Sequence, residues 1–304
     1  MPGAVISASV GSMPVERPID HLVLCVRDLD AARRAYERLG FNLTPKALHP
    51  FGTANSLVQL QGNFLELLAI ADRRLIKPAG KGEFAFAAFN ERFLAEREGM
   101  SMLVFASDDA RRDQREFAAA GLDTYAPFDF SRQAVLPDGS AVTVGFSLAF
   151  VTETRMPDAA FFVCQQHAPQ YFWKPEYQRH RNGAIAVDEV VMVAPDPAVF
   201  ASFFAKLQPG GAVERRETGL AVTTGRGMLT VLDPAGFAAR FPQAGAAIPR
   251  TPHFAAYRMR VADLPATEAL LRANGIAISR QGTRIQLGPA ETFGVVLEFA
   301  ASEG

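Results

Sequence analysis

The clearest hydrophobic pattern in the chain lies near its start, between Ile19 and Leu29. Apolar side chains occupy both faces of an extended chain here, as in Leu22-Val23-Leu24, which predicts a strand covered on both sides. Asp28 follows and can cap a helix over Leu29–Leu39, which Gly40 can close in the left-handed conformation. The stretch therefore reads as a buried strand leading into a helix, and it carries His21, which an apolar strand does not need.

This strand-and-helix pattern recurs, each time followed by short strand candidates that turn residues separate. The units begin at Ile19, near Met100, at Val187 and at Phe254. The first and fourth correspond best, because Val26-Arg27-Asp28-Leu29 matches Val261-Ala262-Asp263-Leu264. The strands expected after the helices of the first two units are Asn42–Ala47, Ala54–Gln61 and Asn63–Ile70, then Gln133–Leu136, Ser140–Thr152 and Phe161–Gln165.

Four units of the βαβββ type predict an α+β fold. Helical spacers follow the first and third units, at Phe84–Glu98 and Asp233–Phe241, so the units pair as one with two and three with four. We expect a flexible N-terminal tail at residues 1–16 and a first domain at 17–182. An aromatic linker at 164–183 ends that domain, and a second domain follows at 183–304.

Composition narrows the class of protein. A chain of 304 residues is long enough for two cores, and a net charge of −1 with both signs mixed gives no basic block for nucleic acid. Two cysteines in apolar runs favour a reducing compartment. No apolar run spans a membrane, and residues 1–13 lack the features of a signal peptide. We therefore expect a cytoplasmic protein with a small-molecule partner, and a homodimer remains an open alternative.

The repeat resembles the vicinal oxygen chelate superfamily, which includes glyoxalase I and the extradiol dioxygenases. Three motifs are similar to the glyoxalase-like domain family of the "glyoxalase 3" type: Ile19-Asp20-His21, Gly52-Thr53-Ala54-Asn55 and Asn63-Phe64-Leu65-Glu66-Leu67. The resemblance implies that each pair of modules curls into a mixed β-sheet half-barrel. It also implies a divalent ion, held by the first and last strands of both modules, that chelates two neighbouring substrate oxygens. Because the superfamily contains isomerases, lyases, dioxygenases and binding proteins, the fold alone does not give the activity.

In the first module, the two ligand positions of that family fall on His21 and Glu66, which we predict to be catalytic and to bind zinc, iron, manganese or nickel. The alternative is a core histidine that is hydrogen-bonded to a paired glutamate. In the second module the positions fall on Ser101 and near Cys164, with Gln166 on the same strand face, or on Gln165 and His167 if the register slips. The four-ligand set of glyoxalase I is therefore not reproduced. The second pair offers Glu189, Ala256 and Glu298 without a histidine, so we expect it to be structural, or a lid and dimer surface.

The segment from Cys164 to Gly183 contains the single tryptophan, Trp173, and two of the five histidines, His167 and His180. One interpretation makes it a pocket wall, with Trp173 against the substrate and His167 or His180 supplying a proton or a hydrogen bond. The other makes it a linker that staples two domains together. Asn55 is placed either in the pocket or in a turn.

Three functions stay open. The first is a metal-dependent enzyme for a substrate with adjacent oxygens, with His21, Glu66 and His167 as catalytic residues. The second is a binding protein that sequesters an aromatic or polyketide-like compound in the same pocket. The third is a metal-free enzyme that uses His21 and Glu66 as an acid/base pair. The predicted substrate-binding residues are Asn55, Ser101, Cys164, Gln166, Trp173 and His180.

Overall fold

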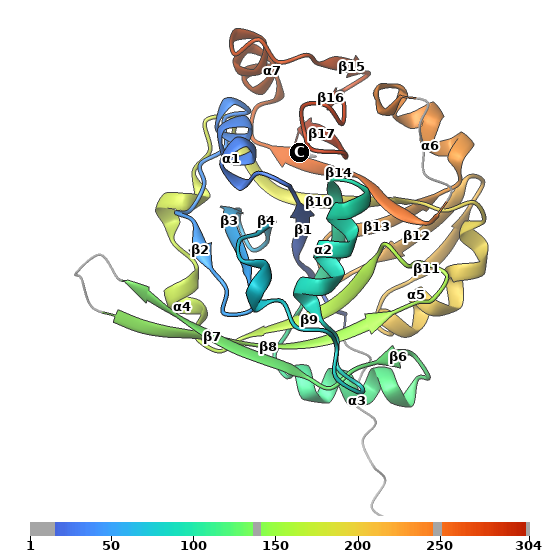
Figure 1. The fold of residues 1–304 in the computed structure, drawn as a ribbon. Coiled ribbons are helices and arrows are strands. Elements are labelled where there is room, and N and C mark those ends of the chain that lie inside the picture. The colour runs from blue at the N-terminus through green and yellow to red at the C-terminus, as the bar shows by residue number, and fades with distance from the viewer. Residues whose placement is uncertain (1–15, 136–140, 246–250, 302–304) are drawn as a thin grey trace, which may run out of the picture.

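Two mixed β-sheets organise the computed structural model, which describes residues 16–135, 141–245 and 251–301 (Figure 1). The first sheet contains β1 (Ile19–Cys25), β2 (Ala47–Leu48), β3 (Thr53–Gln59), β4 (Phe64–Ile70), β5 (Gly99–Ser107), β6 (Asp123–Thr124), β7 (Phe128–Val135), β8 (Ala141–Thr152) and β9 (Ala160–Gln166). The second contains β10 (Ala184–Val193), β11 (Val213–Arg216), β12 (Gly219–Thr223), β13 (Met228–Leu232), β14 (His253–Val261), β15 (Ser279–Gln281), β16 (Arg284–Leu287) and β17 (Val296–Ala301).

The strand order follows from the repeat. In every module the first strand pairs in parallel with the last, as β1–β4, β5–β9, β10–β13 and β14–β17. The first strands of two modules meet antiparallel in the middle of each sheet, as β1–β5 and β10–β14. The four predicted βαβββ modules and their pairing are thus confirmed.

Helices begin where the sequence places capping aspartates. Asp28 accepts backbone hydrogen bonds at the start of α1 (Leu29–Arg38), and Asp109 and Asp263 do the same at α3 (Ala110–Ala119) and α7 (Leu264–Ala273). Gly40 takes a φ of +90° just after α1, as predicted. The other helical segments are α2 (Phe86–Glu96), α4 (Pro169–Phe172), α5 (Ala201–Leu207), α6 (Pro234–Arg240), and the 3₁₀ turns η1 (Arg73–Leu75), η2 (Pro175–Gln178), η3 (Pro197–Phe200) and η4 (Pro242–Ala244).

One predicted strand is wrong. The structure replaces Asn42–Ala47 by an irregular segment and the short strand β2. Thr44 still reaches β3, since its backbone N–H donates to the Leu57 carbonyl at 2.9 Å. Pro45 follows immediately and has no N–H to continue such a ladder, which explains the irregular backbone. Leu136 and Ser140, which end two other predicted strands, lie outside the described residues, as do residues 1–15 of the predicted tail.

The two sheets share one apolar core, which also contains the inward residues of α1, α3, α5 and α7. Tyr36 of α1 and Tyr257 of β14 are both fully buried, and their hydroxyls lie 2.9 Å apart. Phe161 of β9 packs against Phe204 and Phe254 of the second half. The predicted domain boundary at residues 182/183 stays a prediction, because buried side chains of both halves form one cluster.

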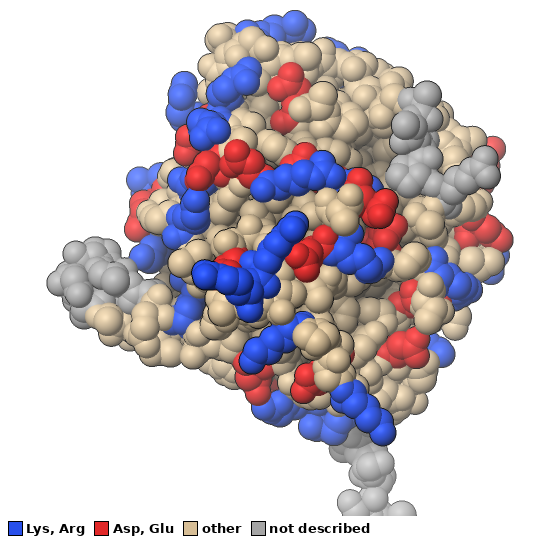
Figure 2. Space-filling view, in the orientation of Figure 1, with Lys and Arg blue, Asp and Glu red and all other residues tan. Residues whose placement is uncertain are grey.

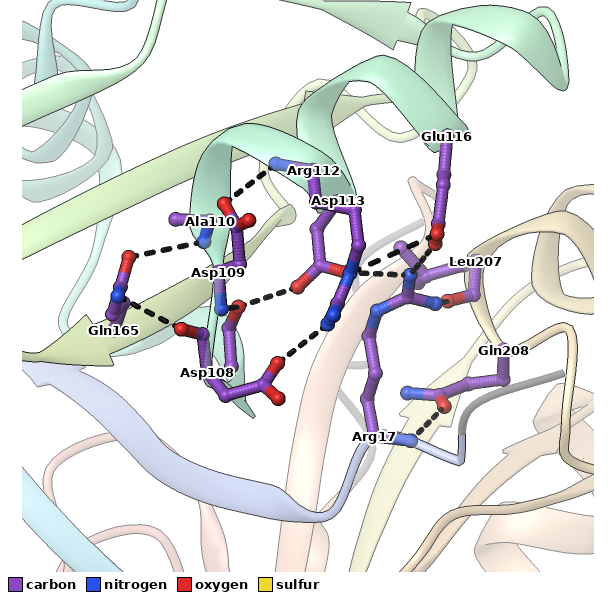
Figure 3. A network of polar contacts seen from close by, with 11 residues as sticks. Arg17, Asp108, Asp109, Ala110, Arg112, Asp113, Glu116, Gln165, Leu207 and Gln208 are labelled. Atoms are coloured by element: carbon purple, nitrogen blue, oxygen red, sulfur yellow. Dashed lines mark hydrogen bonds and ion pairs between the residues drawn. The ribbon is translucent and has the colours of Figure 1, made fainter. Parts of the chain in front are cut away.

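A buried arginine also joins the two halves (Figure 3). The Nη2 of Arg17 bonds Asp113 at 2.9 Å and Glu116 at 2.7 Å, both on α3. Its Nη1 donates to the carbonyl of Leu207, and its backbone N–H donates to the side chain of Gln208, at the end of α5. Arg17 therefore ties the chain before β1 to a helix of each half.

Charged side chains of both signs are interspersed over the face of the molecule in Figure 2, in line with the mixing expected from the sequence. Within the described ranges, no helix is long and apolar enough to cross a membrane.

The stability of the fold is expected to fall in mild acid because of His253. This histidine on β14 is buried, and its Nδ1 donates to the Thr251 carbonyl at 2.8 Å. Burial lowers the pKa of His253 from 6.5 to about 4; Arg97 adds to this, whereas Asp158 opposes it. The unfolded chain therefore binds a proton in this pH window that the folded chain does not, so stability is lost as pH falls.

We expect a loss of roughly 3 kcal/mol of unfolding free energy from this group between about pH 7 and about pH 4. Urea unfolding at both pH values measures it, and His253→Gln should remove this part of the dependence. An unchanged pH dependence in His253→Gln would contradict the assignment.

Candidate functional site

An aromatic cavity opens on the face of the first sheet that α2 partly covers. Strand alternation turns one set of side chains from β1, β3, β4, β7, β8 and β9 toward it. Its empty space amounts to about 510 Å³, open solvent at its mouth included. Its walls are His21, His49, Phe51, Asn55, Leu57, Phe64, Glu66, Phe86, Phe130, Arg132, Phe146, Leu148, Phe162, Cys164 and Phe172.

The register of β1 against β4 brings His21 and Glu66 together. His21 pairs with Phe64, and Val23 pairs with Glu66, so the imidazole and the carboxylate are diagonal neighbours on one face. His21 Nε2 lies 3.7 Å from Glu66 Oε2, and both side chains are buried. The imidazole stacks on Phe64 with 4.3 Å between ring centroids. The predicted meeting of His21 with Glu66 is confirmed.

Asp20 orients His21. Its Oδ2 lies 2.6 Å from His21 Nδ1, and because a carboxylate only accepts, Nδ1 carries the shared proton. In its neutral form His21 then keeps an unprotonated Nε2. That atom makes no hydrogen bond with the described residues, since Glu66 is too distant at 3.7 Å. The arrangement resembles a general base whose tautomer a carboxylate holds.

Asn55 holds Glu66 on its other side. Its Nδ2 donates to Glu66 Oε1 at 2.6 Å and lies 3.2 Å from His49 Nε2. His49 Nδ1 in turn bonds the Thr53 hydroxyl at 2.7 Å. Burial lowers the pKa of His49, which Glu66 only partly opposes, so this imidazole stays neutral and accepts from Asn55.

The donor set does not fit the metals predicted from the sequence. His21 Nε2 and Glu66 Oε2 are close enough to share an ion, but zinc and iron sites use three or more protein ligands. His49 Nε2 would be the third donor, 4.0 Å from Glu66 Oε1, yet the amide of Asn55 already binds both atoms. Across the part of the chain that the structure describes, no three His, Cys, Asp or Glu side chains converge as a metal site.

Comparison with known proteins decides the family. The family model described as "Glyoxalase-like domain" matches residues 19–208, from β1 to the end of α5. The chain belongs to the glyoxalase-like domain family. The family predicted from the sequence is thereby confirmed, and no protein with a curated description matches this family member.

Solved structures share the fold of this glyoxalase-like protein at 12% sequence identity each. A hypothetical protein from Staphylococcus aureus has a TM-score of 0.67, over 93% of this chain and 99% of that chain. A mutant 4-hydroxymandelate synthase from Streptomyces coelicolor has a TM-score of 0.55, over 96% of this chain and 94% of that chain. The Mn(II)-bound glyoxalase from Novosphingobium aromaticivorans has a TM-score of 0.54, over 95% of this chain and 83% of that chain. These likenesses confirm the α+β fold of paired modules.

Of the other predicted residues in the glyoxalase-like protein, Asn55 and Cys164 line the cavity. Burial raises the pKa of the Cys164 thiol well above its usual value, so it is a neutral wall residue. Gln166 is not among the lining residues, and its Nε2 donates to Asp20 Oδ1 at 3.3 Å. From the linker, Phe172 lines the cavity and Trp173 packs on Phe64.

Ser101, His167 and His180 are not brought to the cavity. Ser101 donates to Asn90 and lies 3.3 Å from the sulfur of Cys25. His167 contacts the Ser147 hydroxyl at 2.8 Å and lines a separate surface hollow. Both ring nitrogens of His180 bond backbone groups, the Asn42 N–H and the Gln59 carbonyl. His180 thus ties the linker to the sheet, as the structural interpretation of this segment expects.

Sequence reasoning missed three residues of the site: Asp20, His49 and Arg132. Asp20 stands inside the motif Ile19-Asp20-His21, directly before the predicted ligand His21. Phe128, Phe130 and Arg132 alternate with period two along β7. This pattern lies just N-terminal to Gln133, where the predicted strand begins, and would have extended that strand to include Arg132. His49 precedes β3 in a loop, and no periodicity marks it.

On the second sheet, ion pairs occupy the position that corresponds in the repeat to the His21–Glu66 site of the first sheet. Glu189 precedes the capping Asp196 by the same interval that separates His21 from Asp28. Arg240 of α6 bonds Glu189 at 2.6 Å and Glu298 at 3.0 Å, and Arg258 adds a 2.6 Å contact to Glu189. An arginine thus occupies the space between the two carboxylates, which supports the expectation that this half is structural.

Proposed function

We propose that the cavity is the catalytic centre of a small-molecule enzyme that moves a proton on a substrate with two adjacent oxygens. The observation that carries this proposal is the Asp20–His21 pair, which leaves His21 Nε2 unbonded at the wall of an apolar cavity beside Glu66. His180, which does not line the cavity, instead bonds backbone groups at both ring nitrogens.

The step assigned to the site is removal of a proton from a carbon next to a carbonyl. The proton passes to His21 Nε2, and the C–H electron pair moves onto the carbonyl oxygen as an enolate. Asp20 stabilises the imidazolium that forms, and Glu66 adds a second negative charge nearby. In an α-hydroxy carbonyl compound, transfer of the hydroxyl proton to the enolate oxygen, with formation of a new C=O, and return of the first proton to the neighbouring carbon complete an isomerisation. Departure of a leaving group with the electron pair of its bond completes an elimination. Neither outcome needs an oxidant.

The experiment is deuterium exchange in D₂O, followed by proton NMR. The panel contains α-hydroxy ketones, α-keto acids and α-hydroxy acids, which share adjacent oxygens and a C–H bond next to a carbonyl. The protein should catalyse loss of that C–H signal for at least one member. Compounds that bind in the cavity without any exchange would contradict the proposal and favour the sequestering protein considered from the sequence.

Metal removal is a second, independent test, which asks whether His21 and Glu66 hold a metal ion. Since Asn55 occupies the third donor position, dialysis against EDTA is expected to leave the exchange rate unchanged. Elemental analysis of protein purified without chelator accompanies the assay. Loss of activity that Mn²⁺ restores, with one ion per chain, would instead support the zinc, iron, manganese or nickel site predicted from the sequence.

A further inference from the structure

The cavity contains a cation that the proposed proton transfer does not use. Arg132, on β7, lines both the cavity and the wider hollow at its mouth. It is only partly exposed, and burial lowers its pKa, while the charge of Glu66 opposes this. Arg132 makes no hydrogen bond or ion pair with any described residue. Arg17 and Arg240, by contrast, each bond two carboxylates.

The surroundings of Arg132 supply no direct ion pair, although the negative charge of Glu66 acts on it from a longer distance. Among the described residues that line the cavity and its mouth, Glu66 is the only carboxylate. Asn55 binds one oxygen of Glu66, and no ion pair within 4.0 Å joins Glu66 to Arg132. The mouth adds Lys174, whose side chain has no ion pair within the described part of the chain, and Lys46, which Asp30 binds at 2.8 Å. A partly desolvated guanidinium is unfavourable unless an anion accompanies it.

We propose that Arg132 recognises the carboxylate of a small aromatic acid, and that such acids are the substrate class of this cavity. The inference rests on the proposed function, since it concerns the same site. Its own observations are the unpaired guanidinium and the ring-lined walls.

The shape and chemistry of the walls define the rest of the ligand. Seven phenylalanine rings line the cavity, and rings pack on one another in edge-to-face and offset arrangements. Because the rings stand close together around the cavity, a single benzene ring with a short acid chain is the largest ligand that we propose. The planar fork of arginine matches both oxygens of a carboxylate. The ring therefore enters among the phenylalanines, and the acid group stays at Arg132.

Calorimetric titration with phenylacetate and phenylacetamide at neutral pH tests the inference. The two probes have nearly the same shape, and only the first is an anion. Wild-type protein should bind phenylacetate about 10- to 100-fold more tightly than phenylacetamide, as expected for a charge-assisted hydrogen bond. The fluorescence of Trp173, the single tryptophan, reports whether the ligand reaches the cavity, because Trp173 packs on Phe64 with 5.7 Å between ring centroids.

Two variants sharpen the test. Arg132→Met keeps much of the apolar stem and should abolish the preference for the acid while leaving the binding of the amide unchanged. Arg215→Met removes the same charge from an exposed position on β11 and should keep the full preference. Equal binding of acid and amide by wild type, an undiminished preference in Arg132→Met, or no binding of either probe would overturn the inference.

Failure here is distinguishable from failure of the proposed function. His21-dependent exchange of a neutral α-hydroxy ketone, without acid preference, would leave proton transfer standing and reject the role of Arg132. A preference for the acid that depends on Arg132, without any exchange activity, would support the role of Arg132 and reject the proposed proton transfer.

Discussion

His21→Ala is expected to lower the rate of substrate deuterium exchange by about 10²- to 10⁴-fold, the usual contribution of a positioned general base. Among the described residues, the alanine variant removes the only unbonded imidazole nitrogen of the cavity, whereas Phe64, Phe162 and the other ring walls remain. The measurement is kcat/KM for exchange of the best panel compound. Circular dichroism checks that the variant folds.

Two further variants define the role of His21. Asp20→Asn should also lower the rate, because an amide at this position no longer stabilises an imidazolium at His21. His253→Gln removes a buried histidine from β14 of the other sheet and should leave the rate unchanged. An exchange rate in His21→Ala equal to that of wild type would reject the site.

Arg17→Met is expected to lower the free energy of unfolding by about 3–5 kcal/mol, the range for breaking a buried ion pair on one side. Arg17 is 1% exposed and Asp113 2% exposed, so the substitution leaves a carboxylate inside the protein without its main counterion (Figure 3). The loss should be large because Arg17 also contacts the end of α5. Urea unfolding followed by Trp173 fluorescence measures it.

Glu116→Gln is the matched control, since Glu116 binds the same guanidinium but is 42% exposed. An exposed partner contributes little, so we expect a change of at most about 1 kcal/mol. A similarly small change in Arg17→Met would mean that Arg17 does not hold the two halves together.

The sequence predicted the features that depend on local structure. Asp28 caps α1 because the chain turns from β1 into a helix there, and the same local signal at Asp263 reveals the repeat. Once β1 and β4 are parallel neighbours in a module, the period-two alternation of strands places His21 and Glu66 on one face. Fold, family and the central pair of side chains therefore follow from patterns within single modules.

The rest of the site depends on contacts between modules and on loops. Arg132 reaches the cavity only because β7 of the second module folds over the first. His49 is placed by a loop whose conformation no periodicity specifies, and it engages Asn55, which blocks the expected metal geometry. His167 follows the end of β9 and contacts Ser147 instead of the cavity, and no pattern in the sequence indicates this direction.

The tautomer of His21, read from long-range ¹H–¹⁵N NMR spectra at a pH where the imidazole is neutral, tests most directly whether His21 is a base in the cavity. We predict a protonated Nδ1 bound to Asp20 and an unprotonated Nε2 whose signal shifts when a cavity ligand is added. A proton on Nε2, unaffected by ligand, would contradict this prediction, because His21 would then be a hydrogen-bonded core residue with no base to offer.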